Sequence, residues 1–170
     1  MDFVELVKSR YSVRSYQARP VEQDKLDRIL EAVRLAPSGS NRQPWKFVVV
    51  RDAEVRRRLV AACSDQPFIA QAPIVVAGVG LLPDRVMRCD IPGDAVDVTI
   101  AMEHLALAAT AEGLGTCWIG AFYQDQVRAV LGIPESVKVV AVMTLGYAAD
   151  SPRSKSRKPV GEIVCYDRWQ

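Results

Sequence analysis

The fold is decided by the stretch Asp94-Ala-Val-Asp-Val-Thr-Ile-Ala-Met-Glu-His-Leu-Ala-Leu-Ala-Ala-Thr-Ala-Glu112. Its length and composition predict one long helix that is apolar on most of its faces, and such a helix must be covered on all sides. Gly113 follows where a left-handed residue commonly ends a helix. In a chain of 170 residues, a partner subunit is an expected source of part of that cover.

Shorter elements surround this helix on both sides in the sequence. Apolar residues at helical spacing and helix-stop signals predict further helices over residues 2–10, 21–35, 54–63 and 124–131. Apolar runs typical of buried strands occupy residues 46–50, 73–79, 116–119 and 137–147. Strands that alternate with helices in this way predict a single α+β domain over residues 1–170, with a central mixed β-sheet flanked by helices.

Composition and charge exclude several classes of protein. The chain has 22 basic and 20 acidic residues, a balance that argues against a general nucleic-acid binder. The N-terminus lacks the layout of a signal peptide, and Asp97, Glu103 and His104 make the longest apolar region too charged for a membrane span. We therefore expect a cytoplasmic protein without a membrane partner, whose four cysteines are free thiols.

The motifs of common metal and hydrolytic sites are absent from the sequence. No CxxC pair is present and His104 is the single histidine, so no metal site is predicted. There is no GxSxG elbow, and Gly113-Leu-Gly115 follows a helix where a dinucleotide fingerprint would follow a strand. No side chain is predicted to act as a catalytic acid or base.

Three polar segments lie between the apolar ones, and each has an ordinary explanation as well as a functional one. Arg10-Tyr-Ser-Val-Arg14 can bind a phosphate, or its arginines can simply complement a helix C-terminus. The loop 36–45 can offer hydrogen-bond donors to a ligand, or form a plain turn. The basic run 155–159 is typical of a solvated surface. Taken singly, these segments leave both explanations open.

Taken together, four segments resemble the successive signatures of the nitroreductase family, in the family's order and over nearly the whole chain. They are Arg10-x-Ser-x-Arg14, Ala36-Pro-Ser-x-x-Asn-x-Gln-Pro-Trp45, Gly113-Leu-Gly-Thr-Cys-Trp-Ile-Gly-Ala-Phe122 and Arg157-Lys-Pro-Val-x-Glu-Ile-Val164. The resemblance is to a short, single-domain branch, because the stretch 81–93 leaves no room for the helical excursion of longer members. It implies an intertwined homodimer with a C-terminal extension, which would give Tyr166 and Trp169 a surface to cover.

The resemblance also implies a cofactor site that is built by both subunits around FMN. The phosphate, ribityl and pyrimidine portions are assigned to residues from both ends of the chain, namely Arg10, Tyr11, Ser12, Arg14, Lys155 and Arg157. The other subunit contributes Pro37, Ser38, Gly39, Ser40 and Asn41. Gln66 is expected at the pyrimidine edge, and the ring is expected to lie along Trp118, Ile119, Gly120 and Ala121, with a backbone N–H near Gly120 facing flavin N5 and O4.

The reaction implied is a two-step, ping-pong transfer of hydride from NADH or NADPH through flavin N5 to a small acceptor such as a nitroaromatic or quinone. The flavin carries the chemistry, which fits the lack of an acid–base pair in the sequence. A non-catalytic FMN-binding or storage protein would show the same binding residues. A dehalogenase or flavin-fragmenting branch of the same family is the other alternative.

Overall fold

The computed structural model describes residues 2–152 and 154–169, so Met1, Arg153 and Gln170 lie outside the described part. Its centre is a four-stranded sheet with the order β1 (Trp45–Val50), β2 (Ile74–Gly80), β4 (Lys138–Gly146) and β3 (Gly115–Ile119). All three neighbouring pairs are antiparallel. The sequence predicted a mixed sheet, but parallel pairing among the described residues is limited to the isolated bridge between Ser12 and Thr116. The apolar runs predict strands without fixing their directions.

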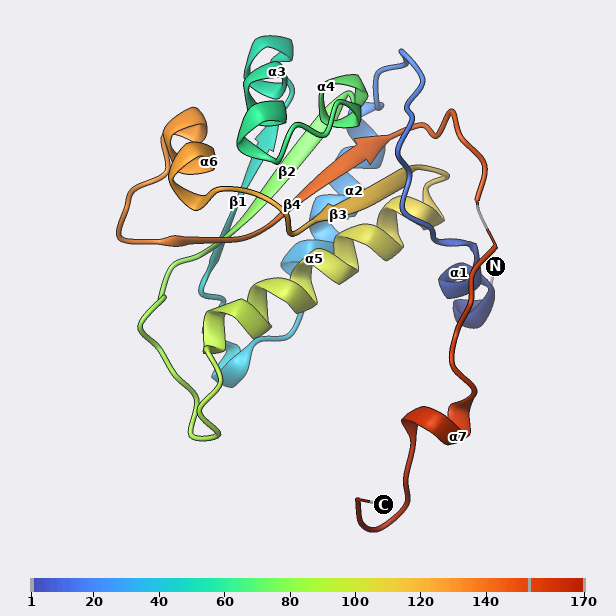
Figure 1. The fold of residues 1–170 in the computed structure, drawn as a ribbon, viewed down its shortest axis with the longest axis vertical. Helices are drawn as coiled ribbons and strands as arrows, with labels where there is room; N and C mark the ends of the chain where they lie inside the picture. Colours follow the sequence, from blue (N-terminus) through green and yellow to red (C-terminus); the bar gives the residue numbers. More distant parts are fainter. Residues whose placement is uncertain (1, 153, 170) are drawn as a thin grey trace.

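Helices cover both faces of this sheet (Figure 1). One face packs against α2 (Gln23–Arg34) and α5 (Gly93–Ala111), and the other against α3 (Ala53–Ala62), α4 (Phe68–Gln71) and α6 (Gln124–Leu131). Strand β2 serves both layers, because its successive side chains point to opposite faces: Ile74 and Val76 join the first core and Val75 and Ala77 the second. The α+β class predicted from the sequence is confirmed.

The predicted helices and strands all form, with ends that move by at most two residues. Three elements were not predicted: α4, the 3₁₀ turn η1 (Gly39–Asn41) and α7 (Val160–Ile163). Each spans four residues or fewer, which is too short to show a helical period in the sequence. The predicted cap of α5 is present, since Gly113 has a φ of 75° and the N–H of Leu114 donates to the carbonyl of Ala109.

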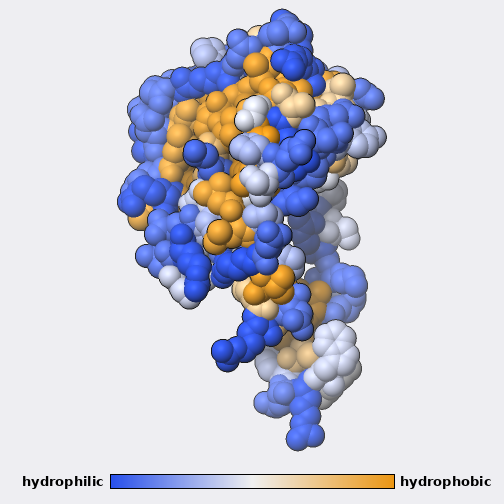
Figure 2. All heavy atoms as spheres, turned by 90° about the vertical axis from the view of Figure 1, so that its left-hand side faces the viewer, coloured by the Kyte–Doolittle hydropathy of each residue, from blue (hydrophilic) through white to orange (hydrophobic). Residues whose placement is uncertain are grey.

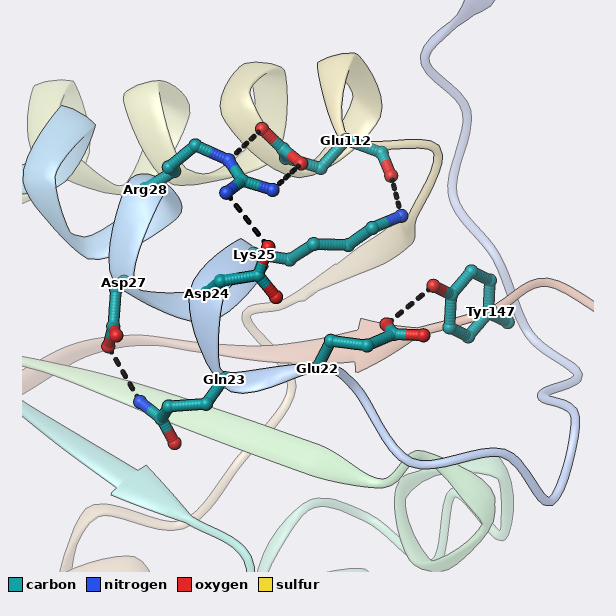
Figure 3. Close-up of polar contacts among 8 residues, drawn as sticks. All are labelled: Glu22, Gln23, Asp24, Lys25, Asp27, Arg28, Glu112 and Tyr147. Carbon is teal, nitrogen blue, oxygen red and sulfur yellow. Dashed lines mark hydrogen bonds and ion pairs between the residues drawn. The ribbon is translucent and has the colours of Figure 1, made fainter.

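Helix α2 is tied by polar side chains to the end of α5 and to the end of β4 (Figure 3). Arg28 donates to both carboxylate oxygens of Glu112 at 2.8 Å, and the Lys25 ammonium donates to the carbonyl of the same residue. At the start of α2, the hydroxyl of Tyr147 donates to Glu22 at 2.6 Å. Both contacts lie near the start of β3, where Gly115 pairs with Gly146 at the end of β4.

The two ends of the chain expose apolar surface that the rest of the described chain does not cover. Helix α1 (Phe3–Ser9) has no buried residue, and Phe3 is 68% exposed. Beyond Asp150 the chain runs away from the sheet through α7 (Figure 1), and Trp169 at its end is 93% exposed. Figure 2 shows hydrophobic spheres on this tail as well as on the body. Within residues 2–152 and 154–169, no helix has the length and apolar composition that crossing a membrane requires.

The Glu22 carboxylate gives the fold a testable acid dependence. Its pKa is lowered to about 2, first by the hydrogen bond from Tyr147 and also by Arg19. A carboxyl group with a lowered pKa stabilises the folded state above its ordinary pKa, and this contribution is lost as the pH falls towards the folded value. We expect Tyr147→Phe to raise the pKa of Glu22 and to reduce the stability lost between about pH 4.5 and pH 2.

NMR titration of the side-chain carboxyl measures this directly, alongside urea unfolding at several pH values. Asp27→Asn, on the same helix but without a contact to Tyr147, is the control. An unchanged Glu22 titration in Tyr147→Phe would show that the hydroxyl is not what holds the charge.

Candidate functional site

The segment that follows α1 lies along the outer edge of β3 and then along the end of β4. The N–H of Val13 donates to the carbonyl of Thr116 at 2.9 Å, and the N–H of Ala149 donates to the carbonyl of Ser15 at 2.8 Å. The bridge between Tyr16 and Ala148 continues this pairing. The chain after β4 is therefore held beside residues 10–14, although more than a hundred residues separate the two segments in the sequence.

The two segments enclose a cavity of about 280 Å³. All six residues predicted from the two ends of the sequence line it, together with four others: Arg10, Tyr11, Ser12, Arg14, Asp150, Ser151, Ser154, Lys155, Ser156 and Arg157. Four of these side chains are cationic and three are serines of the polar loop after β4. Ser151, Ser154 and Ser156 could not be predicted from the sequence, because polar loop residues of this kind are usually only solvated.

Lys155 lines this cavity close to the positive charges of Arg10 and Arg157. Its ammonium group donates to the carbonyls of Lys8 and Arg10, which joins the loop after β4 to the end of α1. The pKa of Lys155 is lowered, first by partial removal from water and then by the positive charges of Arg10 and Arg157. Several cationic side chains around one cavity can donate charge-assisted hydrogen bonds to a phosphate group, whose negative charge would offset their repulsion.

Asp150 is the one acid among the cavity-lining residues, and its role there is to order the backbone. Its carboxylate accepts the N–H of Arg14 at 2.9 Å, and its carbonyl accepts the hydroxyl of Tyr11 at 2.8 Å. Burial raises the pKa of Tyr11, and the negative charge of Asp150 raises it further. Asp150 was not among the site residues predicted from the sequence. The only available signal was an acid four residues after a long strand, which is common in turns.

The predicted ring-binding segment forms the end of β3, which is the edge strand of the sheet. Because the carbonyl of Thr116 faces Val13 across the outer edge, strand alternation places the N–H of Trp118 at that same edge. Ile119 is buried in the core, and the same alternation directs its backbone groups towards β4. Beyond it, Gly120 and Ala121 are exposed, and a Cβ added to Gly120 would meet nothing within 4 Å. A flat group can therefore approach this edge closely.

The predicted loop Pro37, Ser38, Gly39, Ser40 and Asn41 lies elsewhere, at the beginning of α5. The N–H of Gly39 donates to the carboxylate of Asp97 at 2.9 Å. Ser12 lies against Thr116, just beyond the other end of the helix. Helix α5 has 19 residues and is therefore about 28 Å long. One chain does not bring this loop and the basic cavity together.

Gln66 lies in the turn between α3 and α4. Its amide nitrogen donates to the carbonyl of Cys63 at 2.9 Å. The N–H of Tyr123 donates to the carbonyl of Ala62, which brings this turn beside the segment that follows β3. Gln66 thus belongs with the ring-binding segment rather than with the basic cavity. All four cysteines are free thiols.

The arrangement is an α+β fold with a cavity lined by four cationic side chains at one edge of the sheet, and with the exposed residues Gly120 and Ala121 after β3. The model of the nitroreductase family matches residues 7–88 and 65–147. The chain is 34% identical over 165 residues to a putative NADH dehydrogenase/NAD(P)H nitroreductase of Methanothermobacter thermautotrophicus, covering 91% of this chain and 82% of that protein. The chain belongs to the nitroreductase family.

Two further similarities extend this result. An FMN reductase [NAD(P)H] of Bacillus subtilis is 32% identical, with 87% of this chain and 66% of that protein covered. The crystal structure of a nitroreductase family protein from Clostridium difficile 630 superposes with a TM-score of 0.84 at 33% identity, and covers 99% of this chain and 100% of that one. The nitroreductase-like fold predicted from the sequence is confirmed.

The contact between Tyr11 and Asp150 makes the electrostatics of the cavity measurable. Replacing the carboxylate in Asp150→Asn removes a negative charge that disfavours the tyrosinate, so we expect the pKa of Tyr11 to fall towards its ordinary value while burial keeps it raised. The measurement is an ultraviolet titration of tyrosinate, with Tyr11→Phe identifying the transition. An unchanged transition in Asp150→Asn would mean that burial alone sets the pKa.

Proposed function

We propose that this chain is an FMN-dependent NAD(P)H oxidoreductase in which two copies of the chain build each flavin site. The predicted enzyme class and cofactors are confirmed by the family match and by relatives named as NAD(P)H nitroreductase and FMN reductase. The placement of the flavin on particular residues, the dimer and the order of the reaction steps are parts of the proposal.

One observation carries the placement of the flavin: four cations from opposite ends of the sequence line one small cavity. We assign the FMN phosphate to Arg10, Arg14, Lys155 and Arg157, where a doubly charged group would offset the repulsion among these cations. Ser12 and Tyr11 line the same cavity, and the hydroxyl of Tyr11 donates to the carbonyl of Asp150. The donor set fits a phosphate monoester in charge and in hydrogen-bonding capacity.

The length of α5 supports a site shared between two subunits. The loop 37–41 and the basic cavity lie at opposite ends of this helix, so a second copy running in the opposite sense would bring the loop of one chain to the cavity of the other. The uncovered apolar surfaces of α1 and of the tail that carries Trp169 fit the same assembly. An intertwined homodimer would bury both.

When bound, FMN supplies the redox chemistry, accepting hydride from NAD(P)H and passing it to a small acceptor such as a nitroaromatic or a quinone in a ping-pong sequence. The chain's own contribution is binding and electrostatics. The edge amides of the segment from Trp118 to Ala121 suit the polar edge of the ring, because backbone N–H groups stabilise negative charge without needing a proton transfer. Gln66 lies beside that segment and can add an amide.

Two further features complete the proposal. Residues 1–170 act as one flavin-binding unit, with the tail serving the partner subunit. We propose the cytoplasm as its compartment, because the four cysteines are free and NAD(P)H is the reductant.

The visible spectrum of the purified protein, before and after anaerobic NADH or NADPH, tests the function. We expect a yellow protein that bleaches on reduction and recovers its colour when a quinone or nitroaromatic is added. Protein that stays colourless after FMN supplementation would refute the cofactor assignment, and a yellow protein that never bleaches would identify a storage protein.

Arg14 provides the test of where the phosphate lies. Its side chain is exposed, and its guanidinium donates to the carbonyl of Ser12 at 3.3 Å, so it adds little to the core. We expect Arg14→Ala to weaken FMN binding about tenfold or more, the usual effect of losing one charge-assisted bond, with an unchanged circular dichroism spectrum. Arg34→Ala, an exposed arginine of α2, is the matched control. Equal flavin affinity in the two variants would place the phosphate elsewhere.

A further inference from the structure

A buried charged pair stands at the beginning of α5, apart from the basic cavity. The guanidinium of Arg85 donates to the carboxylate of Asp97 at 2.9 Å, and the side chains of the two residues are 20% and 4% exposed. A buried ion pair is costly to form and is not needed for the stability of a small core. Asp97 is nearly inaccessible to solvent, and the contact with Arg85 holds the two side chains in one arrangement.

The other carboxylate oxygen of Asp97 accepts the N–H of Gly39, so the pair is joined directly to the loop between α2 and β1. This loop is held in an unfavourable shape. Ser40, Asn41 and Gln43 have φ values of 55°, 53° and 51°, in the left-handed region that side chains other than glycine rarely adopt. Several such residues in one short loop persist only where the surroundings enforce them.

Arg85 itself is closely confined by the backbone around it. A Cβ on Gly39 would lie 2.7 Å from its Nη2 atom, and a Cβ on Gly93 would lie 2.7 Å from its Nη1 atom. The N–H of Gly93 donates to the carbonyl of Arg85 at 2.9 Å. The guanidinium therefore fits between two glycines and contacts the carboxylate that accepts the N–H of Gly39.

We propose that Arg85 and Asp97 are positioning residues that hold the Ser38–Gln43 loop in the shape with which it meets the flavin bound mainly by the partner subunit. This inference rests on the proposed function, since the loop's contact with FMN is part of that proposal. Neither residue touches the cofactor. The pair acts by fixing a strained backbone before FMN binds, so that FMN binding does not include the free-energy cost of ordering the loop.

The first test is a series of variants with FMN affinity as the readout. We expect Asp97→Ala to weaken FMN binding about tenfold to a hundredfold, the range for losing a buried charge-assisted contact. Asp97→Asn keeps an acceptor for Gly39 and is expected to lose less. Arg85→Gln keeps the carboxylate of Asp97 but removes its charged partner. It serves as the second variant if Asp97→Ala does not fold. The matched control is Arg28→Ala, which breaks a charge pair at the other end of α5.

The second readout reports on the loop rather than on stability. Hydrogen exchange of the amides between Gly39 and Gln43 should accelerate in Asp97→Asn and Arg85→Gln without FMN, while the amides of β2 and β4 keep their protection. In Arg28→Ala both sets should stay as in the wild type. Loss of protection throughout the chain would assign Arg85 and Asp97 a merely structural role and overturn the proposal.

A mixed dimer gives the sharpest test. Arg14→Ala damages the phosphate side of a site and Asp97→Asn damages the loop side. If the loop serves the partner's site, a dimer with one chain of each variant has one doubly damaged site and one intact site. We expect such a dimer to regain one tight FMN site, which neither parent homodimer has. No tight site in the mixed dimer would overturn the proposal.

Failure of the inference and failure of the proposed function give different results. If the wild-type protein binds no FMN, the proposed function fails, whatever the variants do. If the wild type binds FMN tightly and Asp97→Asn and Arg85→Gln bind it equally well, the function stands and the positioning role is wrong.

Discussion

The rest of the structure depends on the need to cover helix α5. This helix is apolar around most of its circumference. The sheet and α2 cover most of it within one chain, while Val96, Ile100 and Leu107 are only partly buried. Its length then separates the beginning of the helix, where the loop 37–41 is anchored, from its end, where Thr116 pairs with Ser12. A helix of this length keeps the loop 37–41 and the basic cavity apart within one chain. A site that uses both therefore needs two copies of the chain.

The charges differ between the basic cavity, near the end of α5, and the loop 37–41, near its beginning. At the end of α5, cations face one another with Asp150 as the single acid in the cavity lining, and that acid is engaged by the backbone of Arg14. At its beginning, the charges of Arg85 and Asp97 offset each other in an ion pair. The first arrangement attracts an anion, whereas the second stabilises backbone geometry. This division fits a site in which one subunit binds the charged end of a cofactor and the other subunit shapes the wall.

The sequence predicted the elements well because their signals are local. The helical period of α2 and the continuous apolar runs of β2 and β4 depend only on neighbouring residues. The directions of the strands are not local, and the expected mixed sheet is antiparallel in all its strand pairs. The cationic residues of the cavity came from a resemblance to a family, since nothing in Lys155 or Arg157 alone indicates Arg10. The sequence did not single out Asp150 or Asp97, because their contacts with Tyr11, Arg14 and Gly39 join segments that are far apart in the sequence.

Asp97 is one of the few charged residues in the mostly apolar sequence of α5. A buried carboxylate is costly unless it is paired, and in the structure Asp97 is paired with Arg85. Arg85, the residue that forms the ion pair with Asp97, lies in the short connection before α5 of the same chain. The loop whose Gly39 is bound by Asp97 precedes β1. A shared site of this design links cofactor binding to assembly. If each flavin contacts both chains, FMN stabilises the dimer by mass action, and a loop already fixed by Arg85 and Asp97 leaves more of the binding free energy for that stabilisation.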